Sequence, residues 1–313
     1  MSSLAMRRVA VIGELNVDML ASGLTGLPQM GSEILARDFE MTLGSASAIF
    51  ATGMAKLGHP VTFISQVGKD NFGDFCLAAL KAAGVPTKHV SRNRNVRTGV
   101  TIALSSVRDR ALVTYQGAIA SLTYAQLELS PLKGHRHLHM TSYFLQTGLR
   151  PAFPRIFREA RRMGLTTSFD PNSDLTGAWS VKIREVLAHT DVLFVNETEA
   201  LQLSRAQGVR SALRTLGRFV PCVVIKQGPR GSMAVKDGEI TSAPGFKVKV
   251  LDTTGAGDSF AAGFVSAYLH GSSVAECLRA GNACGALSAV KPGGTAGQPD
   301  EKHLRKFLRA ESR

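Results

Sequence analysis

The chain has 313 residues, of which 44% are hydrophobic, so it can bury a substantial core and is not a disordered or fibrous protein. Its 37 lysines and arginines outnumber its 24 acids, which gives a formal charge of +13. A basic chain can bind nucleic acid, but here the basic residues are scattered and lack interleaved aromatic residues. This pattern favours a basic surface or an anionic small substrate over a specific nucleic-acid site.

The cysteines and the apolar runs indicate where in the cell the protein is expected. The four cysteines show no CxxC spacing and lie in apolar stretches, which predicts buried thiols rather than disulfides or metal ligands. The apolar run before Glu14 has only five residues, too few for the apolar region of a signal peptide. No run approaches the roughly 18 apolar residues of a membrane span. We expect a cytoplasmic protein with no membrane partner.

Short apolar strands alternate with helices along the chain. Strands are expected at 8–13, 61–67, 136–140, 166–169, 192–195 and 220–226, a further strand tail at Val248 and Val250, and a hairpin at 233–236 and 239–242. Helices are expected at 45–57, 152–163, 274–290 and 301–309, with others ending at Ala83 and beginning after Asn196 and near Asp258. This alternation predicts one doubly wound α/β domain spanning residues 1–313, with a mostly parallel sheet.

A second sheet is expected outside that series. Residues 99–105 and 111–116 are rich in Val, Thr and Ile, are joined by Ser106-Val-Arg-Asp-Arg110, and have no helix between them. A loosely alternating strand near 34–41 can pair with this hairpin. Together they predict a small β lid formed by about 14–42 and 96–118.

Three histidines, His135, His137 and His139, are spaced two apart, with His135 directly before the expected strand at 136–140 and the other two on it. On a strand they share one face, so they suit either a metal cluster or half-buried packing. No acid or cysteine accompanies them, and both interpretations stay open.

Polar clusters follow several of the expected strands. They are Asp18, Asp170 with Asn172, Asn196 with Glu199, Gly228, and the stretch from Asp252 to Asp258. Each has an ordinary explanation by itself; Asn196 and Glu199, for example, fit a helix capping box. Since the carboxyl ends of parallel strands meet at one edge of a sheet, we expect the clusters to converge there on a ligand.

The stretch Leu251-Asp-Thr-Thr-Gly255-Ala-Gly-Asp258 is the most informative of these clusters. Its small residues let backbone N–H groups converge at a helix N-terminus, which suits an anionic oxygen. Asp258 fits either a simple helix cap or a base beside that anion site. The chain has no G-x-x-x-x-G-K-[ST], no strand-to-helix G-x-G-x-x-G and no G-x-S-x-G, so P-loop, Rossmann and serine-hydrolase sites are poorly supported.

Asp252-Thr-Thr-Gly-Ala-Gly-Asp258, followed by Ser-Phe and a small-residue helix, resembles the signature of the ribokinase-like (PfkB) carbohydrate kinases. The resemblance extends from Gly13 to Gly294. It implies a three-layer α/β/α fold and an ATP-dependent kinase that transfers the γ-phosphoryl to a hydroxymethyl group of a sugar. It also implies that Asp258 is the base and that Gly255, Ala256 and Gly257 form the anion hole.

The same resemblance implies a nucleotide site. Asn196 and Glu199 match the family's N-x-x-E motif, which implies that they hold Mg²⁺ and the phosphates. Lys226 and Gly228 resemble its K-x-G nucleotide loop, and Asn282 falls where the purine is contacted. Asp252, Thr254 and Gly294 resemble a potassium site seen in some members.

On the acceptor side, Asp18 and Gly44 match sugar-binding positions of the family. Asp170-Pro-Asn172 resembles the fructokinase and ketodeoxygluconate kinase branches, and the resemblance implies that Asp170 and Asn172 also bind the sugar, beside Asp258. The family's Gly-Gly-x-x-x-Asn appears here with Leu43 and Ala48 at its first and last positions, which leaves the substrate open among ribose, fructose and ketodeoxygluconate types. The basic composition suggests an acidic sugar as one hypothesis.

Two other functions remain as alternatives: a nucleoside kinase of the adenosine type on the same fold, and a ligand-binding protein that has lost turnover. Family members often dimerise through the lid, so a homodimer is an expectation too.

Overall fold

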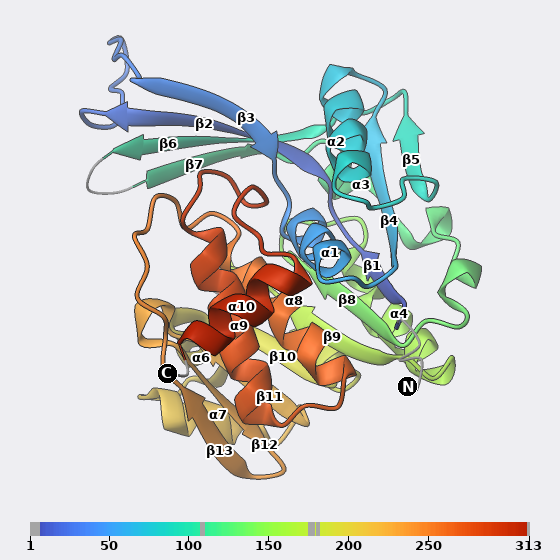
Figure 1. Cartoon of the computed structure of the whole chain (residues 1–313). Coiled ribbons are helices and arrows are strands. Elements are labelled where there is room, and N and C mark those ends of the chain that lie inside the picture. Colours follow the sequence, from blue (N-terminus) through green and yellow to red (C-terminus); the bar gives the residue numbers. More distant parts are fainter. Residues whose placement is uncertain (1–6, 107–109, 175–178, 180–181, 312–313) are drawn as a thin grey trace.

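The computed structural model of the protein describes residues 7–106, 110–174, 179 and 182–311, and its centre is a nine-stranded sheet (Figure 1). The order is β13-β12-β11-β10-β9-β8-β1-β4-β5, and all neighbours are parallel except β11/β12 and β12/β13. The strands are β1 (Val9–Ile12), β4 (Val61–Gly68), β5 (Val90–Asn93), β8 (His137–Thr141), β9 (Thr166–Asp170), β10 (Val192–Asn196), β11 (Cys222–Lys226), β12 (Ser232–Lys236) and β13 (Glu239–Ala243).

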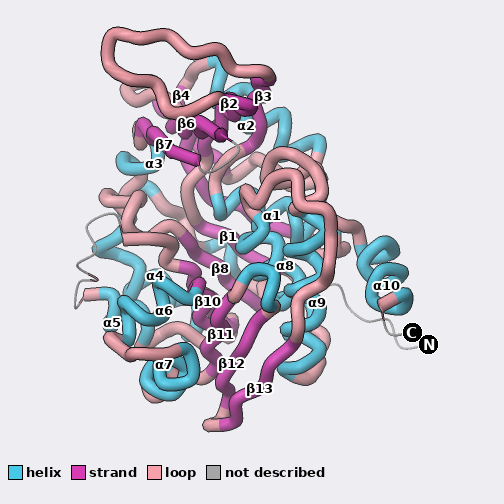
Figure 2. The backbone as a smooth tube through the Cα atoms, turned by 90° about the vertical axis from the view of Figure 1, so that its left-hand side faces the viewer, coloured by secondary structure: helices cyan, strands magenta, loops and turns pink. Residues whose placement is uncertain are grey.

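Helices cover both faces of this sheet, which makes three α/β/α layers (Figure 2). One layer contains α1 (Ala46–Lys56), α2 (Asn71–Ala82), α8 (Ala256–Leu269), α9 (Val274–Ser288) and α10 (Glu301–Ala310). The other contains α4 (Phe153–Arg162), α5 (Ile183–Leu187), α6 (Glu197–Ser204) and α7 (Val209–Leu216). Val9 and Val11 pack into the first layer and Ala10 and Ile12 into the second, because successive side chains of a strand point to opposite faces.

A separate four-stranded sheet, β3-β2-β6-β7, extends from the end of the main sheet (Figure 1). Its strands are β2 (Asn16–Leu24), β3 (Asp38–Leu43), β6 (Gly99–Ser106) and β7 (Arg110–Tyr115), and a short helix α3 (Ala118–Ser121) follows β7. The expected β6–β7 hairpin is present; its loop, 107–109, lies outside the described residues. The strand expected at 34–41 lies at 38–43 and pairs with β2, which the sequence patterns did not predict.

The prediction of a strand within residues 244–255 is wrong. Val248 and Val250 were expected at the end of a strand, but no strand occurs between β13 and α8. Instead, Phe246, Val248 and Val250 line a cavity in front of α8. A segment that turns alternate apolar side chains toward a cavity has the same period of two as a strand, and this explains the error.

The three histidines belong to the interior of the fold. His137 and His139 both contact Ser168 Oγ at 2.7 Å, and His135 Nε2 lies 2.9 Å from Thr62 Oγ1. Within the described ranges, no group of three or more His, Cys, Asp or Glu side chains is placed to hold a metal ion. Burial lowers the pKa of His137 to about 3, so its imidazole is neutral at ordinary pH.

All four cysteines are free and buried, as predicted. None of the helices in the described part of the chain has the length and apolar character needed to span a bilayer.

Candidate active site

Three contiguous cavities run along the N-terminus of α8. An outer cavity of about 590 Å³ is bounded by residues 226–231, 245–250 and α9, and an inner cavity of about 230 Å³ lies under the four-stranded sheet. A central cavity of about 1100 Å³ joins them: it shares Lys226 and Gly257 with the outer cavity, and Asn172, Gly255 and Asp258 with the inner one. The cleft can therefore hold two ligands end to end, with Gly255–Asp258 at the point where they meet.

Asp258 lies in the first turn of α8, at the border of the inner and central cavities. Burial, together with the charge of Asp170, raises the pKa of its carboxyl to about 8, although Lys226 lowers it. Such a carboxyl can lose and regain a proton near neutral pH, which suits a general base.

The helix N-terminus beside Asp258 depends on glycine. Gly255 has φ +68°, and a Cβ there would lie 2.8 Å from Gly294 Cα. The Ala256 amide donates to the Thr253 carbonyl at 3.2 Å, which tightens this turn. First-turn amides of a helix lack intrahelical acceptors, and their dipoles favour an anion, so the turn can stabilise negative charge at the junction of the cavities.

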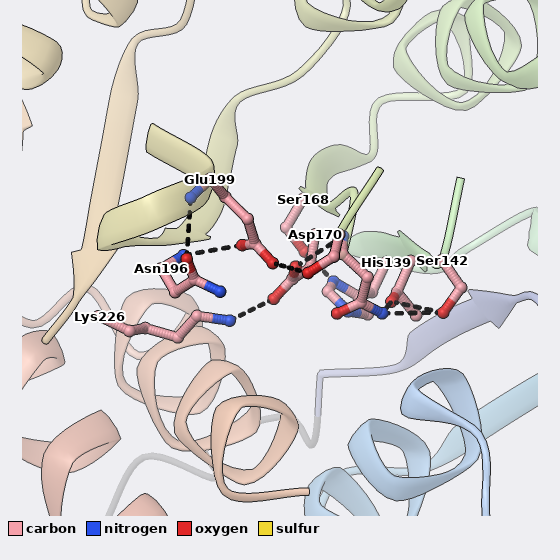
Figure 3. Close-up of polar contacts among 10 residues, drawn as sticks. His139, Ser142, Ser168, Asp170, Asn196, Glu199 and Lys226 are labelled. Carbon is pink, nitrogen blue, oxygen red and sulfur yellow. Dashed lines mark hydrogen bonds and ion pairs between the residues drawn. The ribbon is translucent and has the colours of Figure 1, made fainter. Parts of the chain in front are cut away.

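Lys226, at the end of β11, brings a positive charge to the same point (Figure 3). Its Nζ donates to Asp170 Oδ2 at 2.5 Å, and a Cβ on Gly257 would be only 3.1 Å from Nζ. Burial opposes its charged form, but Asp170 and Glu199 outweigh burial and raise the pKa of Lys226. Asp170 itself is only 1% exposed and lines none of the three cavities, so it supports Lys226 rather than contacting a ligand.

Asn196 and Glu199 form a reciprocal capping box at the start of α6. Asn196 Oδ1 accepts from the Glu199 amide at 2.9 Å, and Glu199 Oε2 accepts from the Asn196 amide at 2.8 Å. Glu199 Oε1 accepts from Ser173 Oγ at 3.1 Å. Burial and the charge of Asp170 raise the pKa of Glu199. Both residues also line the central cavity, so the box that caps the helix can face a ligand as well.

Gly228 and Asn282 both line the outer cavity, Gly228 from the loop after β11 and Asn282 from α9. Asn282 Nδ2 donates to the carbonyls of Ala243 and Pro244 at 3.1 and 3.0 Å, which secures the start of the loop that closes the cavity. The lining is largely apolar, and such a cavity suits a flat aromatic ring.

Asp18 and Asn172 line the inner cavity, Asp18 from β2 and Asn172 from the turn after β9. A Cβ on Gly44 would come within 2.1 Å of Asp18 Oδ1, so only glycine fits beside this carboxylate. Asp18 accepts from Asn16 Nδ2 at 3.0 Å.

Asp252 ties two loops together. Its Oδ1 accepts from the amide and hydroxyl of Thr254 at 2.9 and 2.7 Å, and its Oδ2 accepts from the Gly293 amide at 2.9 Å. A Cβ on Gly294 would lie 2.3 Å from Ile49 Cδ1. The loop at 293–294 is therefore packed directly behind the N-terminus of α8.

The polar clusters lie together, as expected, but two of them do not follow the strands that the sequence predicted. Asp18 lies inside β2 rather than at the end of β1, and the stretch 252–258 follows a loop rather than a strand. The sequence patterns missed Glu14, which lines the inner cavity and directly follows Gly13 at the end of β1. An acid directly after a strand end is a usable signal, but the sequence pattern was assigned to Asp18, four residues further along the chain. They also missed Ser142, because an isolated serine carries no pattern.

Comparisons with known proteins show the family of this chain. A family model described as pfkB family carbohydrate kinase matches residues 6–301. A 2-dehydro-3-deoxygluconokinase from Bacillus subtilis is 30% identical, covering 87% of this chain and 88% of that protein. An ATP-dependent ribose-1-phosphate kinase from Halopiger xanaduensis is also 30% identical, covering 92% and 94%.

A solved structure shows the same fold. A putative ribokinase II from E. coli in complex with ATP and Mg²⁺ matches with a TM-score of 0.85 at 25% identity, covering 97% of this chain and 99% of that one. The chain therefore belongs to the pfkB family of carbohydrate kinases, has a ribokinase-like fold, and is an ATP-dependent carbohydrate kinase.

Proposed function

We propose that this kinase transfers the γ-phosphoryl of ATP to a hydroxymethyl group of a sugar of the ribose, fructose or ketodeoxygluconate type, with Asp258 as the base. The observation that carries the proposal is the position of Asp258, at the border between the inner cavity and the central cavity that leads to the largely apolar outer one. The sugar then occupies the inner cavity and ATP the outer one, and their reacting ends meet at the N-terminus of α8.

The nucleotide end follows from the lining of the outer cavity. The base and ribose lie among apolar side chains and beside Asn282 and Gly228, and the phosphates point toward Lys226. The ammonium of Lys226, held by Asp170, faces the transferred group. The amides of Gly255, Ala256 and Gly257 stabilise the charge that develops on it.

The acceptor end holds the sugar for attack. Asp18 and Asn172 Oδ1 accept hydrogen bonds from its hydroxyls, because both Nδ2 hydrogens of Asn172 are already donated to Thr141 and Ser142. Gly44 and Asp170 keep these two side chains and Lys226 in place. Asp258 accepts the proton of the attacking hydroxyl as the new O–P bond forms. The four-stranded sheet, with Thr114 and Leu112 over the inner cavity, acts as a lid that excludes water.

Mg²⁺ fits the chemistry of this site as a phosphate-bound ion. Both carboxylate oxygens of Glu199 already accept hydrogen bonds, so Glu199 and Asn196 suit contact through water better than direct ligation. When bound, Mg²⁺ neutralises phosphate charge. Asp252, Thr254 and Gly294 form the matching candidate for a potassium site, which would act by setting the position of the α8 N-terminus.

The lid also supports a homodimer. Met41, Ile102 and Val113 are 38%, 40% and 59% exposed on the face turned away from the inner cavity, and β-pairing brings Ile102 and Val113 side by side. An apolar stripe on an exposed sheet suits a second copy of the lid. We place the reaction in the cytoplasm, where ATP and reduced cysteines are both maintained.

The proposal is tested by acceptor-dependent ADP release. Purified protein with ATP and Mg²⁺ is incubated with ribose, fructose, ketodeoxygluconate and adenosine, each with and without potassium. We expect turnover with at least one sugar and a product phosphorylated on its hydroxymethyl group. Turnover of adenosine alone would show the nucleoside kinase instead, and folded protein that turns over none of the acceptors would contradict the proposal.

A further inference from the structure

The inner cavity contains a buried carboxylate that the proposed reaction does not use. Glu14 is only 4% exposed, yet it lines this cavity together with Asp18 and Asp258. Three carboxyl groups therefore surround a space of about 230 Å³. Among the lining residues that the structure describes, there is no lysine or arginine to balance them.

A directed network of donors holds Glu14 in place. Ser47 donates to it from its amide at 3.1 Å and from its hydroxyl at 2.7 Å. Ser142 Oγ donates to Glu14 Oε1 at 2.9 Å, and Asn172 Nδ2 donates to Ser142 Oγ at 2.9 Å. Because Asn172 uses a donor here and a carboxylate only accepts, the chain of hydrogen bonds runs from Asn172 through Ser142 to Glu14. The network fixes the orientation of the Glu14 side chain without adding a cation.

The backbone around this network is strained. Ser45, Ser142 and Asn172 have φ values of 75°, 54° and 54°, and they are three of the six non-glycine residues with positive φ in the described part of the chain. Ser45 Oγ donates to the Glu14 carbonyl at 2.5 Å, and the other two belong to the chain of donors just described. Strain of this kind costs free energy and concentrates at functional sites.

The backbone of Gly13 also lies very close to the Ser47 side chain. A Cβ on Gly13 would lie 1.9 Å from Ser47 Oγ, so the hydroxyl that donates to Glu14 requires glycine at the preceding strand end. The fold thus meets several steric requirements to present one acidic side chain to the acceptor.

We propose that Glu14 is a specificity-determining residue that makes the inner cavity select acceptors without a negative charge. This inference rests on the proposed kinase function. Asp18 accepts hydrogen bonds from sugar hydroxyls, and Glu14, whose oxygens already accept from Ser47 and Ser142, adds a second negative charge to the wall of the cavity. A carboxylate or phosphate on the acceptor therefore meets like charge at short range. The site then favours neutral sugars of the ribose or fructose type over ketodeoxygluconate, whatever the basic composition of the chain suggests.

The test compares matched acceptors. With wild-type protein, kcat/KM is measured for ribose against ribose 1-phosphate and for fructose against ketodeoxygluconate. We expect a preference of about 100-fold or more for the neutral member of each pair, since like-charge contacts are strongly unfavourable in a confined site. Calorimetric titration of each acceptor without ATP should show the same order in binding, which separates recognition from turnover.

The variant Glu14→Gln keeps the shape of the side chain and removes its charge. We expect it to lower the neutral-to-anionic preference about tenfold, while KM for ATP stays unchanged. Glu239→Gln, on the exposed strand β13, is the matched control and should leave the preference unchanged.

Different outcomes would contradict the role of Glu14 and the proposed kinase function. Wild-type protein that prefers the anionic acceptors, or a Glu14→Gln variant with unchanged preference, overturns the role of Glu14 and leaves the kinase function standing. Folded wild-type protein without turnover of any sugar overturns the proposed function itself. The wild-type comparison decides the inference even if Glu14→Gln does not fold.

Discussion

Two opposing influences act on the ionised form of Asp258. The N-terminus of α8 favours its negative charge, whereas burial and acidic neighbours disfavour it. The second influence is stronger, because the pKa of its carboxyl is raised to about 8. The free enzyme at pH 7 therefore holds most of its Asp258 protonated, and only the ionised fraction can accept the proton of the sugar hydroxyl.

The first prediction concerns pH. Since kcat/KM reports ionisation in the free enzyme, kcat/KM for the sugar should rise with pH and level off above a midpoint near 8. Initial rates from pH 5.5 to 9.5 at constant ionic strength measure this. A profile that is flat from pH 5.5 upward would contradict the assignment of Asp258 as the titrating base.

Lys226 carries the second prediction. Its side chain is 15% exposed and that of its partner Asp170 1% exposed, so Lys226→Met leaves a buried carboxylate unpaired. We expect about 3–5 kcal/mol of lost stability, and a fall of about 10²–10³ in kcat because a charge near the phosphoryl group is missing. Because Lys226 lowers the pKa of Asp258, the pH profile should also move to higher pH.

The double variant Lys226→Met with Asp170→Asn is the control for this prediction. It removes the unpaired charge, so denaturant unfolding should show most of the stability regained while kcat stays low. Recovery of kcat together with stability would mean that Lys226 acts only on the fold.

At the scale of elements, the N-terminus of α8 depends on its packing against the loop at 293–294. Gly255 has φ +68°, and its Cα lies against Gly294 and Ile49. The third prediction is that Gly255→Ala shifts this helix end and lowers kcat about 100-fold, because small displacements of catalytic groups are costly.

Gly271→Ala is the matched control, since Gly271 has φ +78° and open space around its Cβ position. Both variants carry the backbone strain, but only Gly255→Ala disturbs the site. Equal losses of kcat in the two variants, measured at the same folded fraction, would show that the backbone strain rather than the position matters.

Some strands of the fold were predictable from the sequence and others were not. The parallel strands β1, β10 and β11 were predicted because each is a short, largely apolar run whose two faces are both buried. β4, β8 and β9 were also predicted, although Thr, Ser, His or Gln interrupts their apolar residues. β2 was missed because its sequence mixes Asp18, Met19 and Ser22 in a sheet with one half-exposed face. The loop with Phe246 and Val248 imitated a strand, since its apolar side chains line a cavity rather than a core.

The site shows the same limit. Asp258, Glu199 and Lys226 were found because their motifs combine chemistry with local backbone structure. Glu14 and Ser142 come together from positions 128 residues apart, and no local pattern records such a contact. Asp170 was predicted to contact the sugar, whereas its carboxylate is buried beside Lys226; only the three-dimensional contact distinguishes the two roles.

On the scale of the whole molecule, the lid sheet separates the inner cavity from an exposed apolar stripe. Asp18, Thr101 and Thr114 face the cavity, and Ile102 and Val113, one residue along each strand, face away. The same two strands can thus close one site and present one interface.

The fourth prediction follows from that stripe. Val113→Glu should convert a homodimer into monomers, because it places a charge on each copy of the apolar stripe. Sedimentation velocity of wild-type and variant protein measures this. Glu239→Gln serves as the control, and wild-type protein that sediments as a monomer at all concentrations would rule out the lid interface.

The central claim is that Asp258 is the base of a phosphoryl transfer. Its most direct test is kcat of Asp258→Asn with the best sugar, measured by ADP release beside Asp237→Asn, a control in the β12–β13 turn. Because the pKa of Asp258 is raised from the ordinary value of 3.8 to about 8, this carboxyl lowers the stability of the fold progressively between those pH values, and the full loss remains above about pH 8; Asp258→Asn should therefore unfold at the same or a higher temperature there. We predict a fall in kcat of about 10³–10⁴ with KM for ATP nearly unchanged; near-normal turnover of the folded variant would contradict the account.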